Sequence, residues 1–256
     1  MENQASWVAA CIACTVHVAG TVVALWADNC VILIRMSETH ATALVPRGLS
    51  DCFTARTTVF YTFAVFLLDL GSGVAIEYGS VFSRTTTRIL NGLDVAMVVA
   101  FIATISVVIA ASISGRAHLR HRALVLYLIV ATVQTIAAVA ALVVTARVRH
   151  DEYLWGLADV GAAYIAIAAV FTGWYWLLDG IVPGGAFVFP GRGGEDLQRP
   201  KLIDYAFISF NTNATFGPTS ETVVSRRVKV AMMLQTSLSL LVLLVLVARL
   251  VQTHGS

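Results

Sequence analysis

Asp204-Tyr-Ala-Phe-Ile-Ser-Phe-Asn-Thr-Asn-Ala-Thr-Phe-Gly-Pro-Thr-Ser-Glu221 joins a short aromatic segment to a loop rich in Thr and Asn, and a long apolar run follows at residues 230–251. The aromatic segment is too short to cross a bilayer as a helix, which takes about 20 apolar residues, whereas the apolar run is long enough. Irregular backbone at membrane depth is tolerated only where protein or a water-filled cavity satisfies its polar groups. The order of half-helix, loop and full helix therefore predicts a membrane protein with a pore-like hairpin at residues 203–221.

The composition of the whole chain agrees with a membrane location. Hydrophobic residues make up 58% of the 256 residues and charged residues only 12%, whereas a soluble domain carries about 25% charged residues. A net charge of +2 gives no indication of nucleic-acid binding. The lipid bilayer is therefore an expected partner, and nucleic acid is not.

The apolar runs and the breakers between them predict an all-α fold. We expect one membrane domain over residues 1–256, a polytopic bundle of six transmembrane helices with a re-entrant half-helix and loop before the last. The fifth connection is long and turn-rich, and it leads into the aromatic segment. The six predicted spans are residues 7–34, 57–78, 93–113, 123–148, 154–178 and 230–251.

The hairpin also carries a resemblance to known proteins. Residues 205–220, the basic Ser225-Arg226-Arg227 and the apolar helix after them resemble an uncharacterised family of bacterial integral membrane proteins, a domain of unknown function. The same hairpin is remotely similar to the pore module of two-helix potassium channels, in which an aromatic pore helix leads into Thr-Val-Gly-Tyr-Gly and a lining helix. The resemblance implies that the pore loop consists of Asn211, Thr212, Asn213, Thr215, Phe216, Gly217, Pro218 and Thr219.

The hairpin departs from the potassium filter at two positions. That filter points successive carbonyls at one axis, which requires glycines with φ values closed to other residues. Here Pro218 fixes φ at about −65°, and Thr219 resists positive φ. We therefore expect a poorly selective pore for small monovalent cations, built by several copies of the chain around one axis. Gly217 is expected to use a φ value that Ala does not favour.

The distribution of basic residues predicts the orientation of the bundle. Twelve Lys and Arg residues fall in loops one, three and five with the collar before the last span: Arg35, Arg47, Arg56, Arg116, Arg120, Arg122, Arg192, Arg199, Lys201, Arg226, Arg227 and Lys229. Five fall on the other side: Arg84, Arg88, Arg147, Arg149 and Arg249. The bias places those loops in the cytoplasm and both termini outside the inner (plasma) membrane. A potassium-channel pore loop would instead enter from outside, so the two arguments conflict.

Charged groups inside a span are costly and indicate function unless a partner satisfies them. Asp69 lies near the middle of the second predicted span and is the strongest intramembrane candidate for a cation or proton contact. Asp94, Asp159 and Asp179 lie near predicted span ends, where a carboxylate reaches water or caps a helix. Residues 116–122 are expected to form a hydrophilic loop that anchors the topology.

Two other function classes fit the same sequence. In one, the protein is a non-conducting structural or accessory subunit whose hairpin packs and caps the bundle. In the other it is a proton-coupled transporter that uses Asp69, although no repeated pair of broken helices supports this. The chain has no Walker loop, His-Glu-x-x-His or dinucleotide fingerprint, and no Cys or His cluster completes a metal site with Cys11 and Cys14. We therefore expect no enzymatic activity, no cofactor and no metal.

Overall fold

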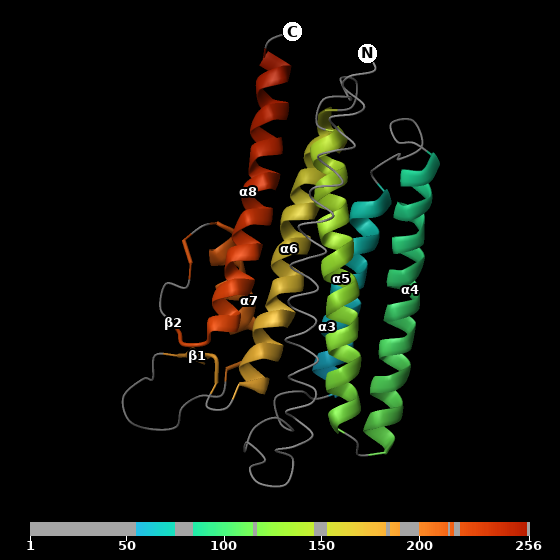
Figure 1. The fold of residues 1–256 in the computed structure, drawn as a ribbon, viewed down its shortest axis with the longest axis vertical. Coiled ribbons are helices and arrows are strands. Elements are labelled where there is room, and N and C mark those ends of the chain that lie inside the picture. Colours follow the sequence, from blue (N-terminus) through green and yellow to red (C-terminus); the bar gives the residue numbers. More distant parts are fainter. Residues whose placement is uncertain are drawn as a thin grey trace. The chain divides into compact units, whose positions relative to one another are not determined.

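The structure is a computed structural model that describes residues 55–74, 84–114, 117–145, 153–182, 185–189, 200–214, 216–217 and 221–254. All of these belong to the compact unit Gly48–Ser256; the other unit, Met1–Arg47, lies outside the described residues together with the first predicted span. The described part is helical apart from one small sheet (Figure 1). Its elements are α3 (Ala55–Val74), α4 (Arg84–Ile113), α5 (Ala117–Thr145), α6 (Tyr153–Ile181), β1 (Phe187–Val188), α7 (Leu202–Asn213), β2 (Thr222–Val223) and α8 (Arg226–His254).

Four of the described helices contain a segment long and apolar enough to cross a membrane. The segments lie in α4, α5, α6 and α8 and are Asn91–Ile113, Leu119–Val143, Asp159–Ile181 and Arg226–Ala248. Helix α3 contains a shorter apolar segment, Arg56–Leu68. Each of the four long segments overlaps a predicted span, so the prediction of a helical protein with several potential membrane-crossing helices is confirmed for this part of the chain.

Helices α4, α5, α6 and α8 are longer than the apolar runs that predicted them. Helix α4 begins at Arg84 and α5 begins at Ala117. The prediction of a hydrophilic loop through residues 116–122 is therefore wrong from Ala117 onward. Arg and Leu are good helix formers, so the backbone hydrogen-bond ladder continues past the apolar run while the charged side chains lie at the helix end. Hydropathy therefore locates the apolar part of each helix but not the residues at which the helix begins and ends.

Long helices that follow one another in sequence run in alternating directions (Figure 1). The starts of α3, α5 and α8 and the end of α6 consequently lie at one end of the bundle. Hydrogen bonds from aromatic side chains fix this arrangement: the Tyr127 hydroxyl donates to the Thr62 carbonyl at 2.9 Å, and Trp174 Nε1 donates to Thr132 Oγ1 at 2.8 Å. All four side chains are buried. Buried polar groups in an apolar medium need such partners, so these bonds set the register between α5 and its neighbours.

Helices α3 and α6 approach each other closely at a glycine. The Tyr61 hydroxyl donates to the Ala169 carbonyl at 2.9 Å, and the Tyr61 ring packs edge-on against Trp176 with centroids 6.1 Å apart. A Cβ at Gly173 would overlap the Tyr61 hydroxyl. Small residues allow helices in membranes to approach closely, and Gly173 serves that purpose here.

A two-stranded antiparallel sheet pairs β1 with β2. In its register Phe187 is opposite Val223, and Val188 is opposite Thr222. With two residues in each strand, no periodicity in the sequence indicates this sheet, and the all-α prediction did not include it. The sheet ties the chain that leaves α6 to the chain that enters α8.

Candidate functional site

The half-helix α7 lies beside α6 and α8, and hydrogen bonds fix how far it reaches along α6. The Ser209 Oγ donates to the Ala168 carbonyl at 2.7 Å, and Asn213 Nδ2 donates to the Tyr164 carbonyl at 2.8 Å. Later residues of α7 thus meet earlier residues of α6, so the two helices are antiparallel. Both carbonyls lie inside the apolar segment Asp159–Ile181. The C-terminal end of α7 therefore lies alongside the interior of that segment.

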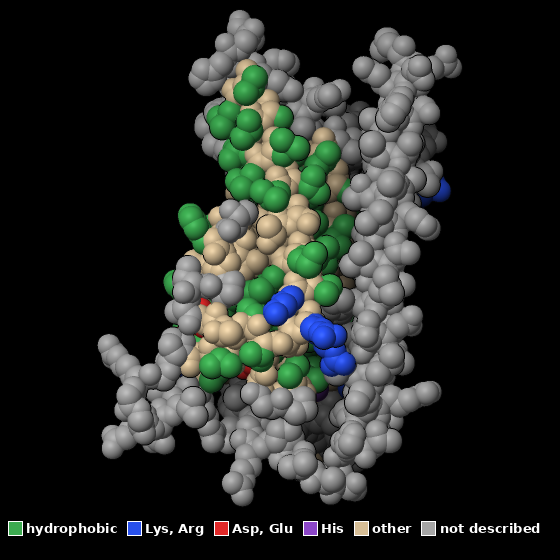
Figure 2. Space-filling model, turned by 60° about the vertical axis from the view of Figure 1, so that its left-hand side comes forward, with side chains coloured by type: hydrophobic (Ala, Val, Ile, Leu, Met, Phe, Trp, Pro, Cys, Tyr) green, Lys and Arg blue, Asp and Glu red, His purple; other side chains and the backbone are tan. Residues whose placement is uncertain are grey.

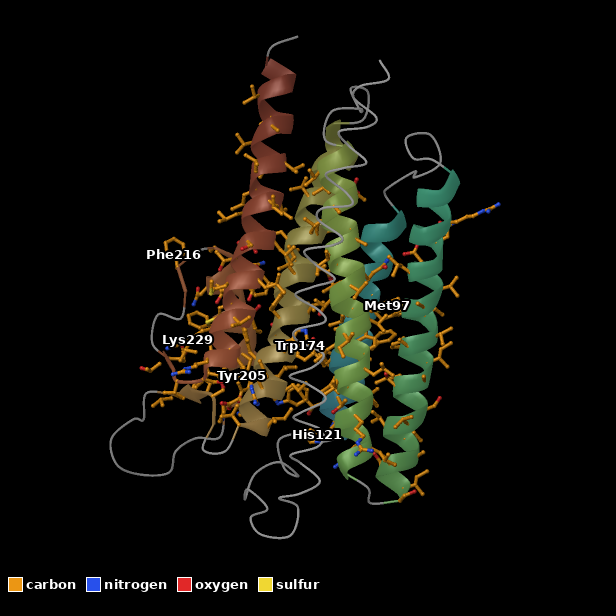
Figure 3. All side chains as sticks on the ribbon, in the orientation of Figure 1. Met97, His121, Trp174, Tyr205, Phe216 and Lys229 are labelled. Atoms are coloured by element: carbon orange, nitrogen blue, oxygen red, sulfur yellow. The ribbon has the colours of Figure 1, made fainter. Side chains whose placement is uncertain are left out.

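After α7 the chain turns and returns to the end at which α7 began. The Phe216 N–H donates to the Asn211 carbonyl at 3.0 Å, which makes the turn, and Gly217 follows with φ of +67°. The chain then forms β2 against β1, and the Val224 N–H donates to the Ala186 carbonyl at 3.1 Å. Because β1 lies shortly after the end of α6, the return segment ends beside that helix end. Figure 3 shows Phe216 at the outer edge of the hairpin, above Lys229 and Tyr205 in that view.

Asp179 connects β1 to α7 near the point at which α7 begins. We call this end the open end of the hairpin. The Asp179 Oδ1 accepts hydrogen bonds from the Ala186 N–H at 2.5 Å and the Phe187 N–H at 3.0 Å. Its Oδ2 accepts one from the Tyr205 hydroxyl at 2.6 Å. One carboxylate near the end of α6 thus binds the strand β1 and the first half of α7. The expectation that this carboxylate reaches water or caps a helix is replaced by bonds to a strand and to a tyrosine side chain.

Aromatic rings pack around this carboxylate. The Phe187 and Tyr205 rings are 6.0 Å apart, the Phe189 and Tyr205 rings 5.8 Å, and the Tyr175 and Phe187 rings 5.8 Å, each pair edge-on. Edge-on packing is a favourable geometry for aromatic pairs. Tyrosine is also enriched at the interface between a bilayer and water. The packed rings therefore join the end of α6, β1 and the start of α7.

A buried polar cluster joins α7 to both long helices. It consists of Tyr175 on α6, Ser209 and Asn213 on α7, and Gln235 and Ser239 on α8, all with 0% exposure. The Gln235 Nε2 donates to the Ser209 carbonyl at 2.8 Å, to Ser209 Oγ at 2.9 Å and to Asn213 Oδ1 at 2.7 Å. The Gln235 Oε1 accepts from the Tyr175 hydroxyl, and Ser239 Oγ donates to Asn213 Oδ1 at 2.6 Å.

This polar cluster explains the polar residues of an otherwise apolar helix. An unpaired amide or hydroxyl in an apolar environment costs about 2–7 kcal/mol, and here each side chain has a partner from another helix. Both ends of the Asn213 amide have partners, because its nitrogen donates to α6 and its oxygen accepts from α8. Asn213 therefore anchors the half-helix within its own chain.

The structure divides the predicted pore-loop residues into two groups. Asn211, Thr212 and Asn213 belong to α7 and not to the loop; the Thr212 Oγ1 donates back to the Ile208 carbonyl at 2.8 Å. The hydrogen bonds of Asn213 to α6 and α8 offset the weak helix propensity of Asn at this position. Of the remaining residues, Phe216 is 78% exposed and Gly217 is described, whereas Thr215, Pro218 and Thr219 lie outside the described residues.

The intramembrane acids fall in different places. Asp69 belongs to α3, one residue beyond the apolar segment Arg56–Leu68, and its side chain lies outside the described residues. Asp94, near the start of the apolar segment of α4, accepts a hydrogen bond from Gln134 Nε2 on α5 at 2.5 Å. Asp94 therefore has a structural partner, as expected of an acid near a span end.

Sequence reasoning missed the α8 members of the polar cluster. Gln235 and Ser239 are four residues apart and therefore share one helix face. Within an apolar run, a Gln and a Ser on one face indicate a polar contact with a neighbouring helix. That spacing was available in the sequence, but its partners, Ser209 and Asn213, could be identified only from the fold.

Gly217→Ala is expected to destabilise the protein modestly. The φ of +67° at Gly217 lies in the left-handed region, where an L-residue costs about 1–2 kcal/mol, while an added Cβ would meet no atom within 4 Å. At about 2–4 °C per kcal/mol for a chain of this size, the melting temperature in detergent should fall by several degrees. Gly161→Ala is the control, because Gly161 is helical and its Cβ also has open space. Equal shifts for the two variants would contradict a strained loop.

Comparison of the chain with known protein families, with curated proteins and with solved structures found no match. The resemblance of the hairpin to an uncharacterised bacterial membrane family stays a prediction from the sequence.

Proposed function

We propose that the protein is a multi-pass protein of the inner (plasma) membrane whose residues 203–221 form a re-entrant pore loop. In this proposal several copies surround one axis and conduct small monovalent cations with weak selectivity. The observation that carries it is the path of the chain: α7 extends along the interior of the apolar segment of α6, and the chain then returns to the end at which it began. A long helix precedes this path and a long helix follows it, as in a pore module.

The side chains of the hairpin are distributed as a re-entrant loop requires. Its buried half is satisfied by α6 and α8 through the polar cluster, so the polar backbone near α7 is enclosed by protein. Its outer edge presents Phe216, which is 78% exposed. A pore with one loop per chain needs several chains around an axis, and this outer edge is where neighbouring loops would meet. Pro218 and Thr219 then prevent a regular ladder of carbonyls.

The basic residues favour one orientation of this loop. Basic residues occur at the starts of α3, α5, α7 and α8, which lie at the same end of the bundle as the open end of the hairpin (Figure 1). They are Arg56, Arg120, Arg122, Lys201, Arg226, Arg227 and Lys229. The positive-inside rule places this end in the cytoplasm and the C-terminal end of α8 outside. The proposed loop therefore enters the membrane from the cytoplasmic side, opposite to a potassium-channel pore loop.

Ion flux into liposomes tests the proposal. We expect purified protein reconstituted into liposomes to carry both sodium and potassium at comparable rates, because the loop lacks a multi-site filter. Protein-free liposomes of the same lipid are the control for leakage. A strong preference for potassium would contradict the interpretation of Pro218 and Thr219. Absence of flux from a folded, reconstituted protein would contradict the pore itself.

One observation favours a second candidate, a non-conducting structural or accessory subunit. The polar cluster is closed within a single chain, so α7 is held without any second copy. A protein that is monomeric in mild detergent and carries no flux would support this candidate. A proton-coupled transporter that uses Asp69 stays a prediction from the sequence.

A further inference from the structure

Four basic residues form a charged collar at the starts of α7 and α8. The basic collar consists of Lys201, Arg226, Arg227 and Lys229; all are exposed except Arg227, which is partly buried. Figure 2, which brings the face of α7 and α8 forward, shows a group of Lys and Arg side chains below a region of hydrophobic ones. Lys229 is labelled at the lower part of the hairpin in Figure 3.

Within the described residues, no acidic side chain balances this concentration of positive charge. Arg226, Arg227 and Lys229 occupy the first turn of α8, which contains no acidic residue. The start of a helix carries the positive end of its dipole, so cations there are unfavourable. Among the described residues no carboxylate forms an ion pair with any of the four. The Asp204 carboxylate is engaged at the start of α7, where it accepts the Lys201 backbone N–H at 2.6 Å.

The surface next to the basic collar is apolar. Directly after it along α8, Val230 is 48% exposed and Met233 is 70% exposed. They begin an apolar face of a helix that is long enough to cross a membrane. Positive charge next to exposed apolar side chains matches the two parts of an anionic lipid, a phosphate headgroup and acyl chains.

We propose that the basic collar binds the headgroup phosphate of an anionic phospholipid whose acyl chains lie along Val230 and Met233. The inference depends on the membrane location and not on conduction. Basic residues beside a membrane-crossing helix attract anionic lipid, and the bound phosphate would offset the like charges in the first turn of α8. Lipid, and not a soluble anion, is the expected occupant because the apolar surface adjoins the charge.

Thermal stability of the full-length protein in mild detergent tests this inference. Phosphatidylglycerol should raise the melting temperature, whereas phosphatidylcholine with the same acyl chains and inorganic phosphate should not. This comparison needs no variant. Arg226→Gln should raise about fivefold the phosphatidylglycerol concentration that gives half of the maximal rise in melting temperature, which corresponds to about 1 kcal/mol for each basic residue. Neutralising Arg226, Arg227 and Lys229 together should raise that concentration about 100-fold.

Arg88→Gln is the matched control, because Arg88 is an exposed arginine of α4 outside the basic collar. It should respond to phosphatidylglycerol like the parent. Equal stabilisation of the parent by phosphatidylcholine would overturn the headgroup preference. Equal stabilisation by inorganic phosphate would make the occupant a free anion. Full retention of the phosphatidylglycerol response after all three neutralisations would place the lipid elsewhere.

Discussion

Replacing Gln235 by leucine is expected to lower the free energy of unfolding by about 3 kcal/mol. Leucine has a similar size, so the change removes hydrogen bonds and leaves the packing nearly intact. The Tyr175 hydroxyl and the Ser209 carbonyl then lose a partner, and Asn213 keeps only Ser239 at its oxygen. Hydrogen bonds between helices inside membranes contribute about 0.6–2 kcal/mol each, so the loss of the bonds to Tyr175, Ser209 and Asn213 gives a total of about 3 kcal/mol.

The measurement is the apparent melting temperature of the detergent-solubilised protein, which should fall by about 10 °C at 2–4 °C per kcal/mol. Ser237→Ala is the control on the same helix, because Ser237 is exposed and bonds only the Met233 carbonyl among the described residues. It should leave the melting temperature nearly unchanged. A second variant, Ser239→Ala, removes the other donor to the Asn213 oxygen, so combining it with Gln235→Leu leaves that oxygen without either donor and should cost more than the sum of the two effects. A Gln235→Leu protein as stable as the parent would show that the polar cluster contributes nothing.

The long helices could be predicted from the sequence because one property, apolar length, determines them. Residues 93–113, 123–148, 154–178 and 230–251 were expected as spans, and each overlaps a helix of the structure. The prediction was less accurate at the ends of the helices. At Ala117 the helix begins before the apolar run, because hydrogen-bonded backbone tolerates Arg and His where side chains reach water.

The inner details of the hairpin could not be predicted, because they depend on partners distant in the sequence. Asn211, Thr212 and Asn213 are typical of a loop, yet they form the last turn of α7. What stabilises that turn is a glutamine of α8 and a carbonyl of α6 that the sequence alone does not bring near. The same holds for Asp179, whose partners lie on β1 and α7. A pattern identifies a polar residue in an apolar run but not the atom it bonds.

Phe216 offers the most direct test that the hairpin lines an ion pathway. We consider a protein in which serine replaces the four native cysteines and cysteine replaces Phe216. A positively charged thiol reagent added from the aqueous phase should react with this cysteine and reduce the cation current, because the added charge repels cations in the pathway. Val95→Cys in the same background is the control, since Val95 is an exposed apolar residue of α4. Its modification should leave the current unchanged. A current that persists at full size after complete modification of the cysteine at position 216 would contradict a pore loop. The absence of any current in the parent protein would contradict it as well.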